Sequence, residues 1–174
     1  MSTGTLNGIP RADPCAHRGV FKRGLQWFFA TRLGVSLTRS LVVPLDQLAL
    51  RATRGHVSVT MGTAPIAVLI STGARSGLQR ETPLQYFTDG DDVVLAASNF
   101  GSGRNPGWYY NLAAHPDCDL RVGAAMGRFV AREVANEDRD RLFDLAIKLY
   151  PGYLKYAGRT EGIRQIRMMR LTPQ

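Results

Sequence analysis

The 174 residues of this sequence are 44% hydrophobic and 21% charged, which is typical of a single globular domain and excludes a wholly disordered chain. The formal net charge of +8 is unusual and points to an acidic partner: nucleic acid, an anionic membrane surface or an acidic small molecule. No apolar run approaches the roughly 18 residues of a membrane span, and the first twenty residues lack a secretory pattern, so we expect a cytoplasmic protein.

Residues 1–58 hold most of the charge excess, with eight basic and two acidic side chains. Residues 1–18 are rich in glycine and proline, which predicts a flexible segment. In Phe21–Leu50, apolar residues recur at helical spacing among basic ones, which predicts a helix that either lies in a membrane interface or packs on the domain. We therefore expect a flexible, basic and partly helical extension over residues 1–58, followed by one domain over residues 59–174.

The rest of the chain has mainly the pattern of β-strands, with two helices inserted late. Strands are expected, in chain order, at Val57–Met61, Pro65–Ser71, Gln79–Thr88, Asp92–Ala97, Cys118–Val122, Gly127–Val134 and Ile163–Leu171. The first helix is expected from Pro106 to about Ala114 with Asn105 as its cap, and the second from Asn136 to Pro151-Gly152. Strand pairs without a βαβ series favour a closed or partly closed antiparallel barrel.

Two glycine-rich loops are candidates for binding an anion. The first glycine loop, Thr72–Arg80, combines two glycines, which permit exposed backbone N–H groups, with the forked donors of Arg75 and Arg80. It lacks the Gly-Lys-Ser/Thr ending of a phosphate-binding P-loop, and an ordinary turn with solvated arginines remains an alternative. The second glycine loop, Ala97–Pro106, leaves a strand and enters a helix beside Arg104. Pro106 stands where a dinucleotide fingerprint needs its third glycine, which argues against Rossmann-type binding.

Aromatic residues form a third candidate group. Tyr150, Tyr153 and Tyr156 follow one another at a spacing of three, which puts them on roughly one helical face as a pocket wall or as core packing. The three histidines and two cysteines are far apart in the sequence, so we expect neither a metal site nor a disulfide.

Taken together, these segments resemble the deazaflavin-dependent nitroreductase family, the actinobacterial reductases that use coenzyme F420. The resemblance rests on Leu69–Gly77 with Arg80 and Pro83-Leu84, on Ala96–Ser98, on Asn105–Leu112 and Pro116, and on Tyr150-Pro151 with Tyr153 and Tyr156. It extends from about Val68 to the C-terminus. It implies a mainly β fold with inserted helices, a split β-barrel of the flavin and deazaflavin-binding type, in which basic residues hold the phosphate and glutamate tail of the cofactor.

The resemblance also implies which residues form the site. Cofactor contacts are expected at Arg75, Ser76, Gly77, Arg80, Pro83, Ala97, Ser98, Asn99, Arg104, Pro106, Trp108, Tyr109 and Asn111. Tyr150, Tyr153 and Tyr156 are expected on the substrate side, with Ser98 or Tyr153 as proton donor. The sequence departs from the family at Ala74, Gln85 and Phe100, where a basic residue, a tyrosine and a glycine are usual.

The residue chemistry and the resemblance agree on a reductase in which F420 supplies hydride and the protein supplies position and electrostatics. We expect reduction of a small acceptor: a quinone, a nitro compound or an enone. Two alternatives stay open, an FMN oxidoreductase of the same barrel class and a non-catalytic F420-binding protein. A nucleic-acid partner is disfavoured, because the charge is concentrated in one arm without a binding signature. Peripheral contact of that arm with the inner face of the cell membrane, and the oligomeric state, also stay open.

Overall fold

The computed structural model describes residues 4–16, residue 45 and residues 64–174. The helix expected within Phe21–Leu50 and the strand expected at Val57–Met61 lie, apart from Leu45, outside the described residues. The predicted boundary at residue 58, and any membrane contact of the N-terminal arm, therefore stay predictions. In the part of the chain that is described, no helix is long and apolar enough to cross a membrane.

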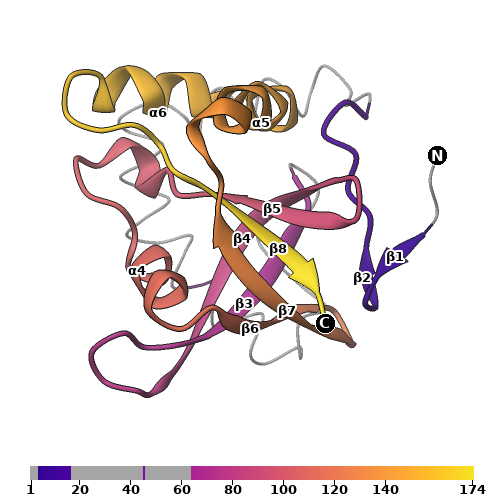
Figure 1. Cartoon of the computed structure of the whole chain (residues 1–174). Coiled ribbons are helices and arrows are strands. Elements are labelled where there is room, and N and C mark those ends of the chain that lie inside the picture. The colour runs from indigo at the N-terminus through magenta and orange to yellow at the C-terminus, as the bar shows by residue number, and fades with distance from the viewer. Residues whose placement is uncertain (1–3, 17–44, 46–63) are drawn as a thin grey trace.

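Six antiparallel strands close into a barrel (Figure 1). They are β3 (Ile66–Thr72), β4 (Gln79–Asp89), β5 (Asp92–Ala96), β6 (Asp117–Val122), β7 (Ala125–Glu133) and β8 (Met168–Pro173). Their order around the barrel is β3-β4-β5-β8-β7-β6, and β6 pairs with β3 to complete the ring. The prediction of a mainly β barrel is confirmed, and five of the expected strands begin and end within two residues of the observed ones.

Alternation along the strands divides the apolar side chains between two cores. On β5, Val93 and Leu95 belong to the barrel interior, whereas Val94 belongs to a second cluster on the outer face. The same division separates Met169 from Met168 on β8. The barrel therefore has a filled interior, and the outer face of β4, β5 and β8 carries its own hydrophobic layer.

The helices cover one end and one outer face of the barrel. α4 (Gly107–Ala114) contributes Trp108 and Leu112 to the interior core. α5 (Asn136–Leu149) and α6 (Gly152–Thr160) pack on the outer face and bury a second core that includes Leu142 and all three late tyrosines. Figure 1 shows these two helices together above the strands and α4 beside the β3–β4 loop.

The N-terminal residues differ from the flexible segment that their composition predicts. β1 (Thr5–Leu6) and β2 (Ile9–Pro10) form a hairpin, and Leu6 and Ile9 are buried in the barrel core. The Asn7 side chain donates to Arg128 O at 2.7 Å. Gly127 permits this close approach, because a Cβ there would lie 2.0 Å from Asn7 O. The glycine and proline residues thus shape a tight turn that presents two apolar side chains to the barrel.

Two further predictions are corrected by local hydrogen bonding. Pro106 rather than Asn105 is the N-cap of α4, without a side-chain cap, because the Asn105 Oδ1 atom accepts a hydrogen bond from Arg164 instead. The last strand is Met168–Pro173, whereas Ile163–Leu171 was expected. The N–H groups of Ile163 and Arg164 both donate to Thr160 O, which keeps this segment in a turn at the end of α6.

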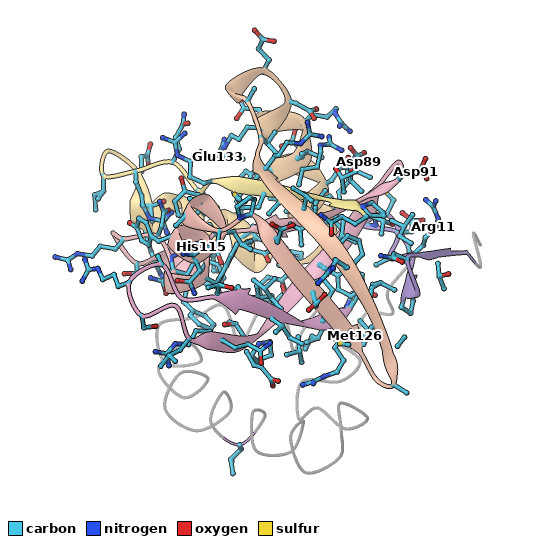
Figure 2. All side chains as sticks on the ribbon, turned by 60° about the horizontal axis from the view of Figure 1, so that its bottom comes forward. Arg11, Asp89, Asp91, His115, Met126 and Glu133 are labelled. Carbon is cyan, nitrogen blue, oxygen red and sulfur yellow. The ribbon has the colours of Figure 1, made fainter. Side chains whose placement is uncertain are left out.

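An ion-pair network fixes α5 to the strands. Arg141 on α5 donates to both carboxylate oxygens of Asp89, at 3.0 and 2.7 Å, and Arg170 on β8 contacts Asp89, Asp92 and Asp138. Hydrogen bonds from Arg141 lower the pKa of Asp89. Figure 2 shows Asp89 with Arg11 and Asp91 on one side of the molecule, away from His115 and Glu133. Arg141 and Arg170 are thus neutralised by neighbouring carboxylates and have a structural role.

Candidate cofactor site

The first glycine loop is a compact turn that links β3 to β4. The Gly73 N–H donates to Leu78 O and the Gly77 N–H donates to Gly73 O, both at 2.8 Å. Gly77 has a φ of 64°, a left-handed conformation that favours glycine. Gly73 has no room for a side chain, because a Cβ would lie 2.6 Å from Ser76 Oγ and 3.1 Å from Leu78 O. Both glycines are therefore required by the shape of the turn.

Asn111 joins this loop to α4. Its Oδ1 atom accepts from the Ala74 N–H at 3.0 Å, and its Nδ2 atom donates to Ser71 Oγ at 3.4 Å. Asn111 lies on the second turn of α4, and the second glycine loop leads directly into that helix. The two loops, which are separated in the sequence by β4 and β5, are consequently held at the same helix.

The donors of the first loop point to an anion-binding surface. Arg75, Ser76 and Arg80 are exposed, and within the described residues no carboxylate pairs with either arginine. The backbone N–H groups of Arg75 and Ser76 also have no hydrogen-bond acceptor in the described part of the chain. Two adjacent amides beside two guanidinium groups form a donor set suited to phosphate or carboxylate.

The second glycine loop has an unusual backbone. Asn99, Phe100 and Gly101 have φ values of 46°, 55° and 76°, so three consecutive residues are left-handed. These three residues form the short 3₁₀ turn η2 (Asn99–Gly101). Non-glycine residues adopt this conformation only where surrounding contacts hold it. Asn99 supplies one such contact, because its Nδ2 atom donates to Arg104 O at 2.9 Å.

Residues from α6 and the segment after it supply the other contacts. The guanidinium of Arg164 donates to four oxygens of the second loop, and Arg159 Nη1 donates to Phe100 O at 3.3 Å. Gly101 lies against α6, where a Cβ would be 3.1 Å from the Cα of Tyr156. Sequence reasoning missed both arginines, since Arg164 lay in a predicted strand where a charged residue implies only a solvent-facing position.

The three late tyrosines lie together, as their spacing predicts. Tyr150 caps the end of α5, and Tyr153 and Tyr156 lie on α6, with ring centroids 5.6 to 6.1 Å apart. Each side chain is only 5% exposed, and the hydroxyls of Tyr150 and Tyr156 lie 3.4 Å apart. Burial raises the pKa of all three phenols. Tyr156 is the member that reaches the second glycine loop, where its ring packs edge-on against Phe100 at 6.1 Å.

Several expected cofactor contacts have structural roles. Trp108 is buried in the barrel core, and Ala97 is fully buried. Strand alternation places Pro83 with its partner Val68 on the outer face, opposite to Arg80. Tyr109 donates to Glu133 Oε2 at 2.7 Å, and burial followed by this bond raises its pKa to about 12.

The remaining expected residues lie at or beside the two loops. These are Arg75, Ser76, Gly77, Arg80, Ser98, Asn99, Arg104, Pro106 and Asn111. Ser98 is half-buried, and its backbone rather than its hydroxyl makes the hydrogen bonds within the loop. Among the described residues, no group of three or more His, Cys, Asp or Glu side chains is arranged to hold a metal ion.

Comparisons with known proteins identify relatives of this chain. An F420H(2)-dependent quinone reductase of Mycobacterium tuberculosis is 37% identical over 109 residues, 62% of this chain and 70% of that protein. A second relative in the same species, also named as an F420H(2)-dependent quinone reductase, is 30% identical over 89 residues, 51% of this chain and 75% of that protein.

Solved structures agree on the fold. The structure of an F420-H2 dependent reductase, FDR-A, matches with a TM-score of 0.56 and 31% identity over 62% of this chain and 93% of that chain. A structure described as a domain-swapped dimer matches with a TM-score of 0.56 and 27% identity over 74% of this chain and 96% of that chain. The predicted barrel type is confirmed by this likeness.

The family model for F420H(2)-dependent quinone reductases matches residues 45–173, which include both glycine loops, α4 and the tyrosine cluster. The match confirms the predicted cofactor, coenzyme F420, and the predicted class of enzyme, an F420-dependent reductase. The chain belongs to the F420H(2)-dependent quinone reductase family.

Proposed function

We propose that this protein binds reduced F420 across its two glycine loops and transfers hydride from it to a quinone. The observation that carries the proposal is the junction at Asn111, which joins the first glycine loop to the helix that begins where the second loop ends. A ligand held by both loops is bound at two points by elements that cannot move independently. Such preorganisation favours binding because less conformational entropy is lost.

The donor set fits the anionic tail of F420. Arg75 and Arg80 offer forked donors on the first loop, Arg104 adds a third on the second loop, and all three are exposed. The neighbouring amides of Arg75 and Ser76 add uncharged donors at the same turn. A phosphate and carboxylate tail would satisfy these groups, whereas Arg141 and Arg170 near Asp89 are already paired with carboxylates.

When bound, F420 supplies the hydride, and the protein positions the acceptor, excludes water and supplies a proton. Ser98 is the better candidate for proton donor, because its hydroxyl lies at the second loop and is not engaged within it. Tyr153, the other candidate from the sequence, is 5% exposed and packs against Phe143 and the other two tyrosines. Burial raises the pKa of its phenol, and the same burial keeps its hydroxyl away from an acceptor bound at the second loop.

A quinone is the acceptor that the surroundings of the second loop favour. Phe100 is half-buried at the second loop, and the buried ring of Tyr156 packs edge-on behind it. An aromatic side chain at this place is suited to a flat apolar ring. The relatives from Mycobacterium are named as quinone reductases, which supports the same acceptor class. Nitro compounds and enones are the alternative acceptors.

The test is anaerobic oxidation of reduced F420 by a soluble quinone, a nitroarene and an enone, followed through the absorbance of the oxidised deazaflavin. We expect the highest kcat/KM for the quinone. Ser98→Ala should lower kcat with little change in the F420 dissociation constant. Binding of F420 without turnover of any acceptor would make this chain a cofactor-binding protein, and preference for FMN over F420 would refute the cofactor assignment for this chain.

A further inference from the structure

Arg164 makes more hydrogen bonds to the second glycine loop than any other described side chain. Its Nη1 atom donates to Ala97 O at 3.1 Å and to Asn105 Oδ1 at 2.8 Å. Its Nη2 atom donates to Ser98 O and its Nε atom to Ser102 O, both at 2.9 Å. All three guanidinium nitrogens are therefore used, and the four acceptors span nine consecutive residues of the loop.

This arrangement differs from that of two other half-buried arginines, Arg170 and Arg121. Arg170 contacts three carboxylates, and Arg121 pairs with Glu81 at 3.0 Å. Arg164 has no carboxylate partner among the described residues, and each of its acceptors in the loop is an uncharged oxygen. Burial lowers its pKa, which is the expected effect of desolvating a guanidinium without a counter-ion. An arginine is buried in this way only where its fork geometry matches the acceptors.

The acceptors surround the part of the loop that needs support. Ser98 and Ser102 flank the left-handed residues 99–101, and Arg164 bonds to the carbonyl on each side. Arg164 is itself anchored, because its N–H donates to Thr160 O at 2.9 Å. The loop is thereby fixed to the end of α6, whose Tyr156 contacts Phe100 within the same loop.

We propose that Arg164 is a positioning residue for the cofactor site: it holds the second glycine loop in its left-handed form and so sets the affinity for F420. The inference rests on the proposed function, because it assumes that the second loop contacts F420. Its basis is the fork geometry of the guanidinium rather than its charge. A lysine in its place keeps the charge but provides one nitrogen, which cannot reach four oxygens on both sides of the loop.

The test compares Arg164→Lys with Arg141→Lys, a matched change in an ion-paired arginine of α5. Amide hydrogen exchange in the ligand-free protein reports on the loop directly, since the Gly101 and Ser102 N–H groups donate to Ser98 O and Asn99 O. We expect Arg164→Lys to speed exchange at these two amides about 10-fold or more, with β5 amides unchanged, and to weaken F420 binding by a similar factor. Arg141→Lys should change neither quantity.

Three results would overturn the proposal. The first is that Arg164→Lys changes neither the amide exchange rate nor the affinity for F420. The second is that Arg164→Lys speeds amide exchange without loss of affinity for F420. The third is that Arg164→Lys keeps full affinity for F420 while Arg164→Met loses it, because that result assigns the effect to the charge of the side chain. If Arg164→Lys does not fold, Asn105→Ala removes one acceptor from the loop surface, and exchange at Gly101 and Ser102 that stays slow in that variant refutes the proposal. Failure of the wild-type protein to bind F420 refutes the proposed function separately, whatever the exchange results.

Discussion

The arginines of the first glycine loop provide the clearest quantitative test of the site. Arg75 and Arg80 are exposed, so each would form a charge-assisted bond to the cofactor tail that is partly screened by water. Such a bond is worth less than the 1.5–3 kcal/mol of a buried one, and we take about 1 kcal/mol for each. The double variant Arg75→Ala/Arg80→Ala should therefore lose about 2 kcal/mol, or roughly 30-fold in dissociation constant.

The assay is a fluorescence titration of F420 at low and at high salt. The loss should be larger at low salt, because salt screens exposed charges. Arg128→Ala is the matched control: it removes one exposed charge from β7 beside the N-terminal hairpin and should leave the affinity within about twofold. An unchanged dissociation constant in a folded double variant, or an equal loss in Arg128→Ala, would refute the assignment of the first loop to the cofactor.

Three further predictions concern other parts of the structure. Gly127→Ala should displace the N-terminal hairpin from Asn7 O and expose Leu6 and Ile9, which lowers the free energy of unfolding by about 2–4 kcal/mol. Chemical denaturation measures this, and a chain lacking residues 1–13 should tolerate the same change. Hydrogen bonds from Arg141 lower the pKa of Asp89, so its contribution to stability is present above the unfolded-state pKa of about 3.9 and is lost as pH falls through the folded-state value. The free energy of unfolding should therefore decline less steeply with falling pH in Asp89→Asn than in the wild-type protein. An identical pH dependence in the two proteins would contradict a stabilising role for the ion pairs of Asp89. Tyr156→Phe should change kcat or KM for the quinone and leave the F420 dissociation constant within a few-fold; a selective loss of F420 binding would assign this residue to the cofactor wall instead.

The sequence predicts the barrel well because strand patterns and turn residues are local signals. The short apolar run of β5 and the Asp89-Gly90 turn are visible without any knowledge of the partner strands. The N-terminal hairpin is different, since its stability depends on burying Leu6 and Ile9 against strands more than 50 residues away. Composition alone therefore predicts flexibility where tertiary contacts impose order.

The candidate site could be predicted only in part, because some of its residues give local signals and others act through distant contacts. The glycines and arginines of the first loop are adjacent in the sequence, and their chemistry therefore predicts an anion site without knowledge of the fold. Arg164 donates hydrogen bonds to backbone carbonyl oxygens 62 or more residues earlier in the chain. Every residue has such a carbonyl, so the amino-acid sequence does not show which of them accept these bonds. Trp108 and Pro83 match the family motif, and the structure places them in the core and on the outer face, which their positions in the motif do not indicate.

The most direct test of the central claim compares F420 with the same deazaflavin lacking its phosphate and glutamate tail. If the two glycine loops hold the tail, F420 should bind at least about 100-fold more tightly, since losing the tail removes several charge-assisted bonds. Raising the salt concentration should narrow this difference. Equal dissociation constants for the two compounds would contradict the account, because the arginines and amides of the loops would then contribute nothing to binding the cofactor.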